Sequence, residues 1–137
     1  MTTQDCINGF LAQQSLAVVG VSRNPNKYGN KIFRQLKASG YEVYAINSAA
    51  RMVEDQKCYP SLADLPVKVG GVVSVVPPEQ TGIIAREAIK LGIHHIWIQP
   101  GAESEAVVRF CEENELNCIA GMCLLVLSSV PAAAQAK

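Results

Sequence analysis

Short hydrophobic runs alternate along this chain with longer segments in which hydrophobic residues recur every three or four positions. The runs are mostly apolar and lie at residues 16–20, 41–46, 71–76, 95–98 and 116–120. Continuous apolar runs of this length are typical of parallel strands that are buried on both faces. We therefore predict about five strands at these positions.

The segments between the runs have the spacing of amphipathic helices. Residues 3–14 carry hydrophobic residues at positions i, i+3 and i+4, and a second hydrophobic stripe precedes Gly40. Pro77 and Pro78 suit the opening of a third helix, which ends at Gly92. Residues 101–115 predict a fourth helix.

The remaining segments are less regular. Residues 48–66 show no clear period, although residues 59–66 predict a short helical turn that is capped by Ser61 and stopped by Pro66. The last residues, 131–137, suggest a loose tail. Strands that alternate with helices indicate βαβ units with right-handed crossovers. We expect residues 1–137 to form a single α/β domain, with a three-layer, doubly wound parallel sheet.

Composition and charge narrow the classes of function. Hydrophobic residues make up 49% of the 137 residues, and twelve basic residues balance twelve acidic ones. This balance gives no net field that would attract nucleic acid or an anionic membrane. Residues 119–127 are too short a run to span a bilayer, and the N-terminal residues lack the features of a signal peptide. We expect a cytoplasmic protein.

The cysteines do not predict a metal site. The five cysteines form no C-x-x-C pair, and the only adjacent pair of another ligand type is His94 with His95. Small buried side chains in a reducing compartment account for the cysteines better.

A ligand is expected at the carboxyl ends of the strands, where open α/β sheets bind small molecules. The loop after the first run opens a helix, whose free N–H groups favour an anion. This loop offers Ser22 and Asn24 as hydrogen-bond donors and Arg23 and Lys27 as cations. The alternative is a solvated turn with two surface cations.

Two features of an NAD site are absent from the carboxyl ends of the predicted strands, so such a site is disfavoured. The sequence GVSRNP, which starts at Gly20, has no second or third glycine of a G-x-G-x-x-G fingerprint. Asn47 stands at the end of the second strand, where an acid would bind the ribose hydroxyls of NAD.

Three blocks of sequence resemble a known family. They are VGVSRNPNKYGN at residues 19–30, YEVYAIN at residues 41–47 and CYPSLADLP at residues 58–66. In this order they resemble the stand-alone CoA-binding domain proteins, a family similar to the N-terminal domain of the succinyl-CoA synthetase α subunit. The resemblance extends from about residue 16 to residue 123. It implies a Rossmann-like CoA-binding fold and coenzyme A as the ligand.

The resemblance also implies a set of binding residues. The phosphate end of the ligand would be held by Gly20, Ser22, Arg23, Asn24, Lys27 and Tyr28, flanked by Asn47 and Arg51. The adenine side would be lined by Val76, Pro77 and Pro78, and the next strand end by Ile98, Gln99 and Pro100. The chain departs from the family pattern at Ser48, Val76 and Met122, which implies weaker binding or a ligand related to CoA.

No catalytic group stands out. His94 and His95 begin a strand, so they point to opposite faces, and we expect one to be exposed and one packed. The synthetase's phosphorylated histidine belongs to a different domain. Cys123 follows the last strand on the side of the expected cleft, where burial without reactivity is the favoured interpretation.

We therefore expect a module that binds CoA or an acyl-CoA without catalysing a reaction. The first alternative is an enzyme, or an enzyme subunit, that uses the same cleft for acyl-CoA or a nucleotide. The second alternative is a structural domain whose apolar residues 124–130 dock another chain, for example in a homodimer.

Overall fold

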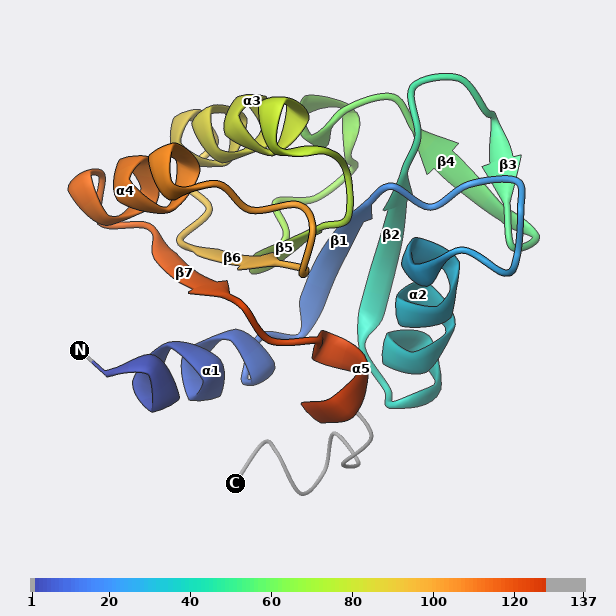
Figure 1. Ribbon diagram of the computed structural model, residues 1–137. Helices are drawn as coiled ribbons and strands as arrows, with labels where there is room; N and C mark the ends of the chain where they lie inside the picture. The colour runs from blue at the N-terminus through green and yellow to red at the C-terminus, as the bar shows by residue number, and fades with distance from the viewer. Residues whose placement is uncertain (1, 128–137) are drawn as a thin grey trace.

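A central sheet lies between two layers of helices in the computed structural model, which describes residues 2–127 (Figure 1). The sheet has seven strands in the order β3-β4-β2-β1-β5-β6-β7, and all its pairings are parallel except that of β3 with β4. The strands are β1 (Ser15–Val19), β2 (Glu42–Ile46), β3 (Met52–Val53), β4 (Gln56–Tyr59), β5 (Gly71–Ser74), β6 (His95–Ile98) and β7 (Asn117–Ala120). The helices are α1 (Thr3–Leu11), α2 (Tyr28–Ala38), η1 (Leu62–Asp64), α3 (Pro78–Lys90), α4 (Glu105–Glu113) and α5 (Leu124–Leu127). The expected doubly wound, Rossmann-like class is confirmed.

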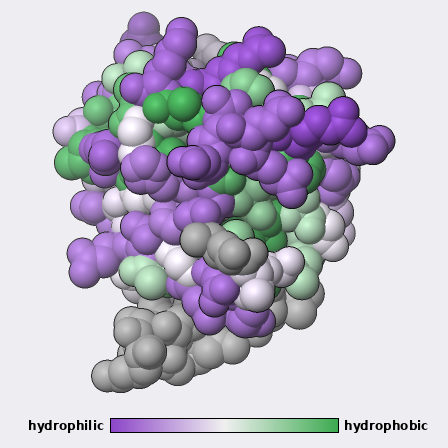
Figure 2. All heavy atoms as spheres, turned by 90° about the vertical axis from the view of Figure 1, so that its left-hand side faces the viewer, coloured by the Kyte–Doolittle hydropathy of each residue, from purple (hydrophilic) through white to green (hydrophobic). Residues whose placement is uncertain are grey.

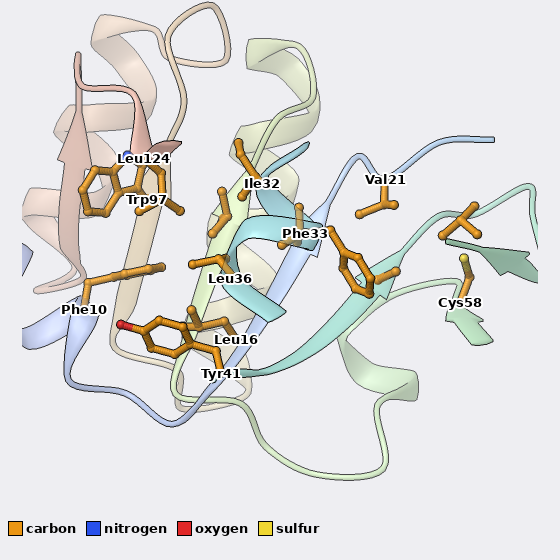
Figure 3. Packing of buried hydrophobic residues seen from close by; sticks show 14 of the residues in the cluster. Phe10, Leu16, Val21, Ile32, Phe33, Leu36, Tyr41, Cys58, Trp97 and Leu124 are labelled. Carbon is orange, nitrogen blue, oxygen red and sulfur yellow. The ribbon is translucent and has the colours of Figure 1, made fainter. Parts of the chain in front are cut away.

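Each face of the sheet has its own hydrophobic core. Leu16 and Val18 of β1 pack with α1, α2 and α5, and Figure 3 shows Leu16 near Leu36 and Phe10 in this core. Ala17 and Val19 pack with α3 and α4 on the other face. Successive residues of a strand point to opposite faces, so a strand covered on both sides is hydrophobic at every position. This is why the strands appear in the sequence as continuous apolar runs.

The two strands beyond the five expected form a hairpin at the edge of the sheet. β3 and β4 lie within the segment that was expected to be irregular, and β4 pairs in parallel with β2 through Cys58 and Tyr59. The short helical turn is therefore confined to η1, because Tyr59 belongs to a strand. A two-residue strand is too short to show a hydrophobic period, so the sequence pattern did not reveal this hairpin.

Two helices differ in length from the expectation. α1 begins at a capping box formed by Thr2 and Asp5 and ends at Leu11, before residue 14. α4 begins at Glu105 after the Ser104 cap, later than residue 101, because Gly101 has a φ of +94° and belongs to a turn.

The segment after β7 is attached to the core of the same chain. The Trp97 indole is fully buried, packs edge-to-face on Phe10 at 5.4 Å between ring centroids, and donates a 2.9 Å hydrogen bond to the Met122 carbonyl. Leu124 opens the unexpected helix α5 and is itself fully buried (Figure 3). Leu124 therefore cannot belong to the expected docking surface, while residues 128–130 and the tail at 131–137 lie outside the described residues.

The character of the outer surface is relevant to docking and to membrane contact. The side of the molecule in Figure 2 is covered mainly by hydrophilic residues, with hydrophobic ones interspersed. In the part of the chain that the structure describes, no helix combines the length and hydrophobicity needed to cross a membrane.

Candidate functional site

A cleft of about 580 Å³ opens at the carboxyl ends of β1, β2 and β5. Four of the residues implicated by the sequence line it: Gly20, Ser22, Asn47 and Val76. Further lining residues are Val19, Val21, Ile46, Ser48, Pro60, Ser61, Gln80, Ile83, Ile84 and Glu87. Volumes of this size are typical of small-molecule sites, and this edge of the sheet is where such folds bind ligands.

The loop after β1 is held in shape by its own hydrogen bonds. The Ser22 hydroxyl accepts a 3.0 Å bond from the Asn24 backbone N–H, and the Asn24 side chain accepts one of 3.0 Å from Asn26. Asn30 of α2 joins the Ser22 backbone on both sides: its Oδ1 accepts from Ser22 N at 2.9 Å, and its Nδ2 donates to Ser22 O at 2.7 Å. Asn30 is only 1% exposed. Asn30 was not among the expected site residues, although it ends the first family block.

Two glycines bring the start of α2 against the end of β1. Gly20 has a φ of +115°, and a Cβ added to Gly29 would overlap the Gly20 carbonyl oxygen. Gly29 thus permits a close approach of helix and strand. In dinucleotide-binding proteins the third glycine of the G-x-G-x-x-G fingerprint, which this chain lacks, has that role.

The start of α2 is a favourable place for an anion. Lys27, at the N-cap, makes no side-chain capping hydrogen bond, in contrast to Thr2 before α1 and Ser104 before α4. The first N–H groups of a helix lack intrahelical acceptors and carry the positive end of its dipole.

Two cations of this loop are exposed, and one of them lies beside the cleft. The Arg23 guanidinium is exposed and donates a 3.3 Å hydrogen bond to the Ala49 carbonyl, next to the lining residue Ser48. Lys27 is exposed at the start of α2. Tyr28 is 62% exposed, and its ring lies 5.3 Å from the Lys31 ammonium. Arg23, Lys27 and Tyr28, which were expected at the phosphate end of the ligand, are therefore exposed to solvent but do not line the cleft.

Asn47 joins the loops after β1 and β2. Its Nδ2 donates to the Val21 carbonyl at 2.8 Å, and its Oδ1 accepts from Ala49 N and Ala50 N at 2.8 and 2.9 Å. The side-chain amide is therefore used to shape the cleft wall. Arg51, expected to flank it, is exposed and is not among the lining residues.

One wall of the cleft comes from α3, and none of the residues that form this wall was among the expected binding residues. Gln80, Ile83, Ile84 and Glu87 follow the i, i+3, i+4, i+7 spacing of one helix face. Ile83 is 63% exposed, an unusual position for a core residue. This spacing can be recognised in the sequence, but it does not show whether that face of the helix packs on the sheet or contacts a ligand.

The two prolines before α3 do not line the cleft. Pro77 is the N-cap and Pro78 the first residue of the helix, as their sequence position predicted. Pro78 instead borders a shallow groove between α3 and α4, together with Glu79 and Arg86.

The end of β6 supports the C-terminal segment and does not line the cleft. Gln99 is 4% exposed; its Oε1 accepts from Leu124 N at 2.7 Å, and its Nε2 lies 3.4 Å from the Cys123 sulfur. Ile98 is buried and Pro100 is exposed, and neither lines the cleft. Cys123 is likewise absent from the lining residues.

The two histidines divide as expected, with His94 exposed and His95 partly buried. Burial lowers the pKa of His95, and the neighbouring His94 lowers it further. Its Nδ1 atom is buried without a hydrogen-bond partner among the described residues. Neither histidine lines the cleft, and residues 2–127 contain no cluster of three metal-ligating side chains.

Together, the doubly wound sheet and the cleft at its carboxyl edge define a small α/β ligand-binding domain with an anion-favouring helix start. The family described as CoA binding domain matches residues 14–129. The chain belongs to this CoA-binding domain family.

Individual relatives agree with the family. The chain is 34% identical, over 67% of its length, to an ADP-forming acetate–CoA ligase II of Archaeoglobus fulgidus. It is 35% identical, over 81% of its length, to the α subunit of the corresponding ligase of Pyrococcus furiosus. It spans only 14% and 25% of these two relatives, respectively.

A solved structure has the same fold at a similar length. It is a conserved hypothetical protein from Pyrococcus furiosus, with a TM-score of 0.78 and 41% identity, covering 83% of this chain and 98% of that one.

Proposed function

We propose that this protein binds coenzyme A or an acyl-CoA in the cleft at the carboxyl ends of β1, β2 and β5, without catalysing a reaction by itself. The observation that carries the proposal is the position of the cleft. It lies beside the uncapped start of α2 in a domain of the CoA-binding family.

The proposed arrangement gives each part of the ligand a chemically suitable place. Phosphates lie over the start of α2, within reach of Arg23 and Lys27. The nucleoside lies against the apolar wall of Val76, Ile83 and Ile84. Val76, one of the positions at which the chain departs from the family pattern, adds to the apolar character of this wall.

An enzymatic role as part of a larger assembly is the second candidate. It is favoured by the ADP-forming acetate–CoA ligases among the relatives, of which this chain spans a quarter or less. In that case the same cleft would hold CoA while catalytic groups come from other domains. A cytoplasmic location belongs to the proposal as well, supported by five free cysteines that fit a reducing compartment.

Calorimetry with CoA and with NAD tests the ligand. We expect measurable CoA binding and no NAD binding, because Asn47 offers no carboxylate to ribose hydroxyls and uses its amide in backbone hydrogen bonds. Mass spectrometry of the natively purified protein, with retained CoA as the expected result, adds a second readout. NAD binding tighter than CoA would overturn the proposal.

A pair of surface variants locates the site. Ile83→Glu places a charge in the cleft wall and should weaken CoA binding at least tenfold. Val67→Glu changes another exposed hydrophobic residue, 45% exposed and outside the cleft, and should leave the affinity unchanged. Equal effects of the two substitutions would mean that CoA binds elsewhere.

A further inference from the structure

The tip of the β3–β4 hairpin has an unusual backbone conformation. Glu54 and Asp55 form its two-residue turn, with φ values of 52° and 58°. Turns with two left-handed residues strongly favour Asn and Gly, because a side chain crowds the backbone there. A glutamate at this position indicates that its side chain forms interactions that offset the cost of the left-handed backbone conformation.

That side chain extends from the hairpin to helix α2. The Glu54 Oε2 atom accepts a 2.7 Å hydrogen bond from Arg34 Nη1 and a 2.8 Å bond from Asn30 Nδ2. The Glu54 side chain is only 12% exposed. The other guanidinium nitrogen of Arg34, Nη2, donates to the Pro25 carbonyl at 2.9 Å.

Both partners of Glu54 hold the loop after β1. Asn30 brackets the Ser22 backbone on its N–H and on its carbonyl, and Arg34 fixes the loop at Pro25. Ser22 lines the cleft. One carboxylate at the edge of the sheet is thus connected, through two side chains of α2, to the loop beside the proposed phosphate site.

We propose that Glu54 is a positioning residue, which fixes the loop of residues 20–27 in the conformation that binds the ligand. Its effect is on affinity more than on folding: without Glu54, Asn30 and Arg34 can still reach the loop backbone, but the carboxylate no longer fixes their orientation. The inference rests on the proposed CoA site for the identity of the ligand.

The charge state of Glu54 agrees with this role. Partial burial raises the pKa of the carboxyl, but the hydrogen bonds from Asn30 and Arg34 and the charge of Arg34 together hold it below its ordinary value. Glu54 is therefore ionised at neutral pH, as two charge-assisted hydrogen bonds require.

Glu54→Gly separates positioning from stabilisation. Glycine suits the left-handed turn, so the melting temperature should stay the same or rise. The loop, however, loses its connection to the hairpin and samples other conformations, and CoA affinity should fall about fivefold to tenfold as the competent fraction decreases. A residue that only stabilised the fold could not produce this combination.

Two variants control the experiment. Asp55→Gly makes the same backbone change one residue later, at an exposed side chain, and should leave CoA affinity within about twofold of the wild type. Glu54→Gln keeps an acceptor for Asn30 but loses the charge, and should bind more tightly than Glu54→Gly. A Glu54→Gly protein with wild-type CoA affinity would overturn the proposal.

A measurement without ligand makes the inference independent of the CoA assignment. The amide resonance of Ser22 in an NMR spectrum should shift in Glu54→Gly and stay in place in Asp55→Gly, since Asn30 accepts from that N–H. If the wild type does not bind CoA, the proposed function fails. An unmoved Ser22 resonance would then overturn the positioning role as well.

Discussion

The polar side chains of the cleft and of the loop after β1 fall into two groups. Ser22 and Asn47 line the cleft, but their side chains form hydrogen bonds with backbone groups, and these bonds preorganise the cleft walls. Arg23 and Lys27 are exposed and are the natural partners for ligand phosphates.

Removing Arg23 should therefore weaken binding without unfolding the protein. A charge-assisted hydrogen bond contributes about 1.5–3 kcal/mol, and about 1.4 kcal/mol corresponds to tenfold in affinity, so Arg23→Ala should weaken CoA binding about tenfold or more. Arg109→Ala, at an exposed cation of α4, is the control and should have no effect.

Dephospho-CoA distinguishes which phosphate is involved. If Arg23 or Lys27 contacts the 3′-phosphate, its loss should matter less for dephospho-CoA than for CoA, whereas a pyrophosphate contact predicts equal losses. Unchanged calorimetric affinities in both Arg23→Ala and Lys27→Ala, with native circular dichroism, would mean that the loop is only a connector.

His95 should make the stability of the protein depend on pH. The ordinary pKa of histidine is 6.5, and burial first, then His94, lowers it in the folded protein. The unfolded chain therefore takes up the proton more readily, so stability should fall as pH drops below about 6.5.

Thermal melts between pH 7.5 and pH 5.5 measure this dependence. His95→Ala should flatten the decline in melting temperature, whereas His94→Ala, at the exposed neighbour, should largely keep it. A decline that persists unchanged in His95→Ala would contradict the assignment.

Helices α2 and α3 each contain a glycine, and the two should respond oppositely to alanine. Gly29→Ala would force α2 away from the Gly20 carbonyl, and overpacking of this kind costs about 1–3 kcal/mol. Around Gly82 the nearest atom to an added Cβ is Val107 Cγ2 at 3.7 Å, so Gly82→Ala should stabilise by about 0.5–1 kcal/mol.

Urea unfolding of both variants tests this contrast. Gly29→Ala should also weaken CoA binding, because the start of α2 would move relative to the cleft, whereas Gly82→Ala should not. Equal stabilities would mean that α2 can shift without cost.

For the molecule as a whole, we expect binding without turnover. Neither histidine lines the cleft, and of its described lining residues only Glu87 is charged, with its carboxylate accepting from Leu62 N at 3.3 Å. The purified chain should therefore not consume acetyl-CoA or succinyl-CoA in the absence of other proteins. Steady turnover that is lost in His94→Ala or His95→Ala would contradict this expectation.

The strand order around the cleft explains how far the candidate site could be predicted. Gly20, Ser22, Asn47 and Val76 follow strands, and parallel strands end at one edge, so the hydrophobic pattern predicts that they lie at the same edge of the sheet. Ile98 is the last residue of β6 and Gln99 follows it, but β6 ends beside α5 and not beside the cleft. The wall of α3 could not be predicted, since helical spacing does not tell which face meets a ligand.

The amino-acid sequence by itself determined those strands and helices whose hydrophobic pattern depends only on neighbouring residues. Leu16–Val19 is apolar because β1 is covered on both faces, and the stripe of Ile32, Phe33 and Leu36 makes α2 amphipathic. These periods depend only on neighbours along the chain. They were enough to establish the class of fold.

The tertiary structure alone decided the hairpin and its link to the loop. The Glu54 turn lacks the residues that favour its backbone, and its partners Arg34 and Asn30 lie 20 and 24 positions earlier in the chain. No local pattern encodes such a contact, because it exists only once β4 has paired with β2 and α2 has packed on the sheet.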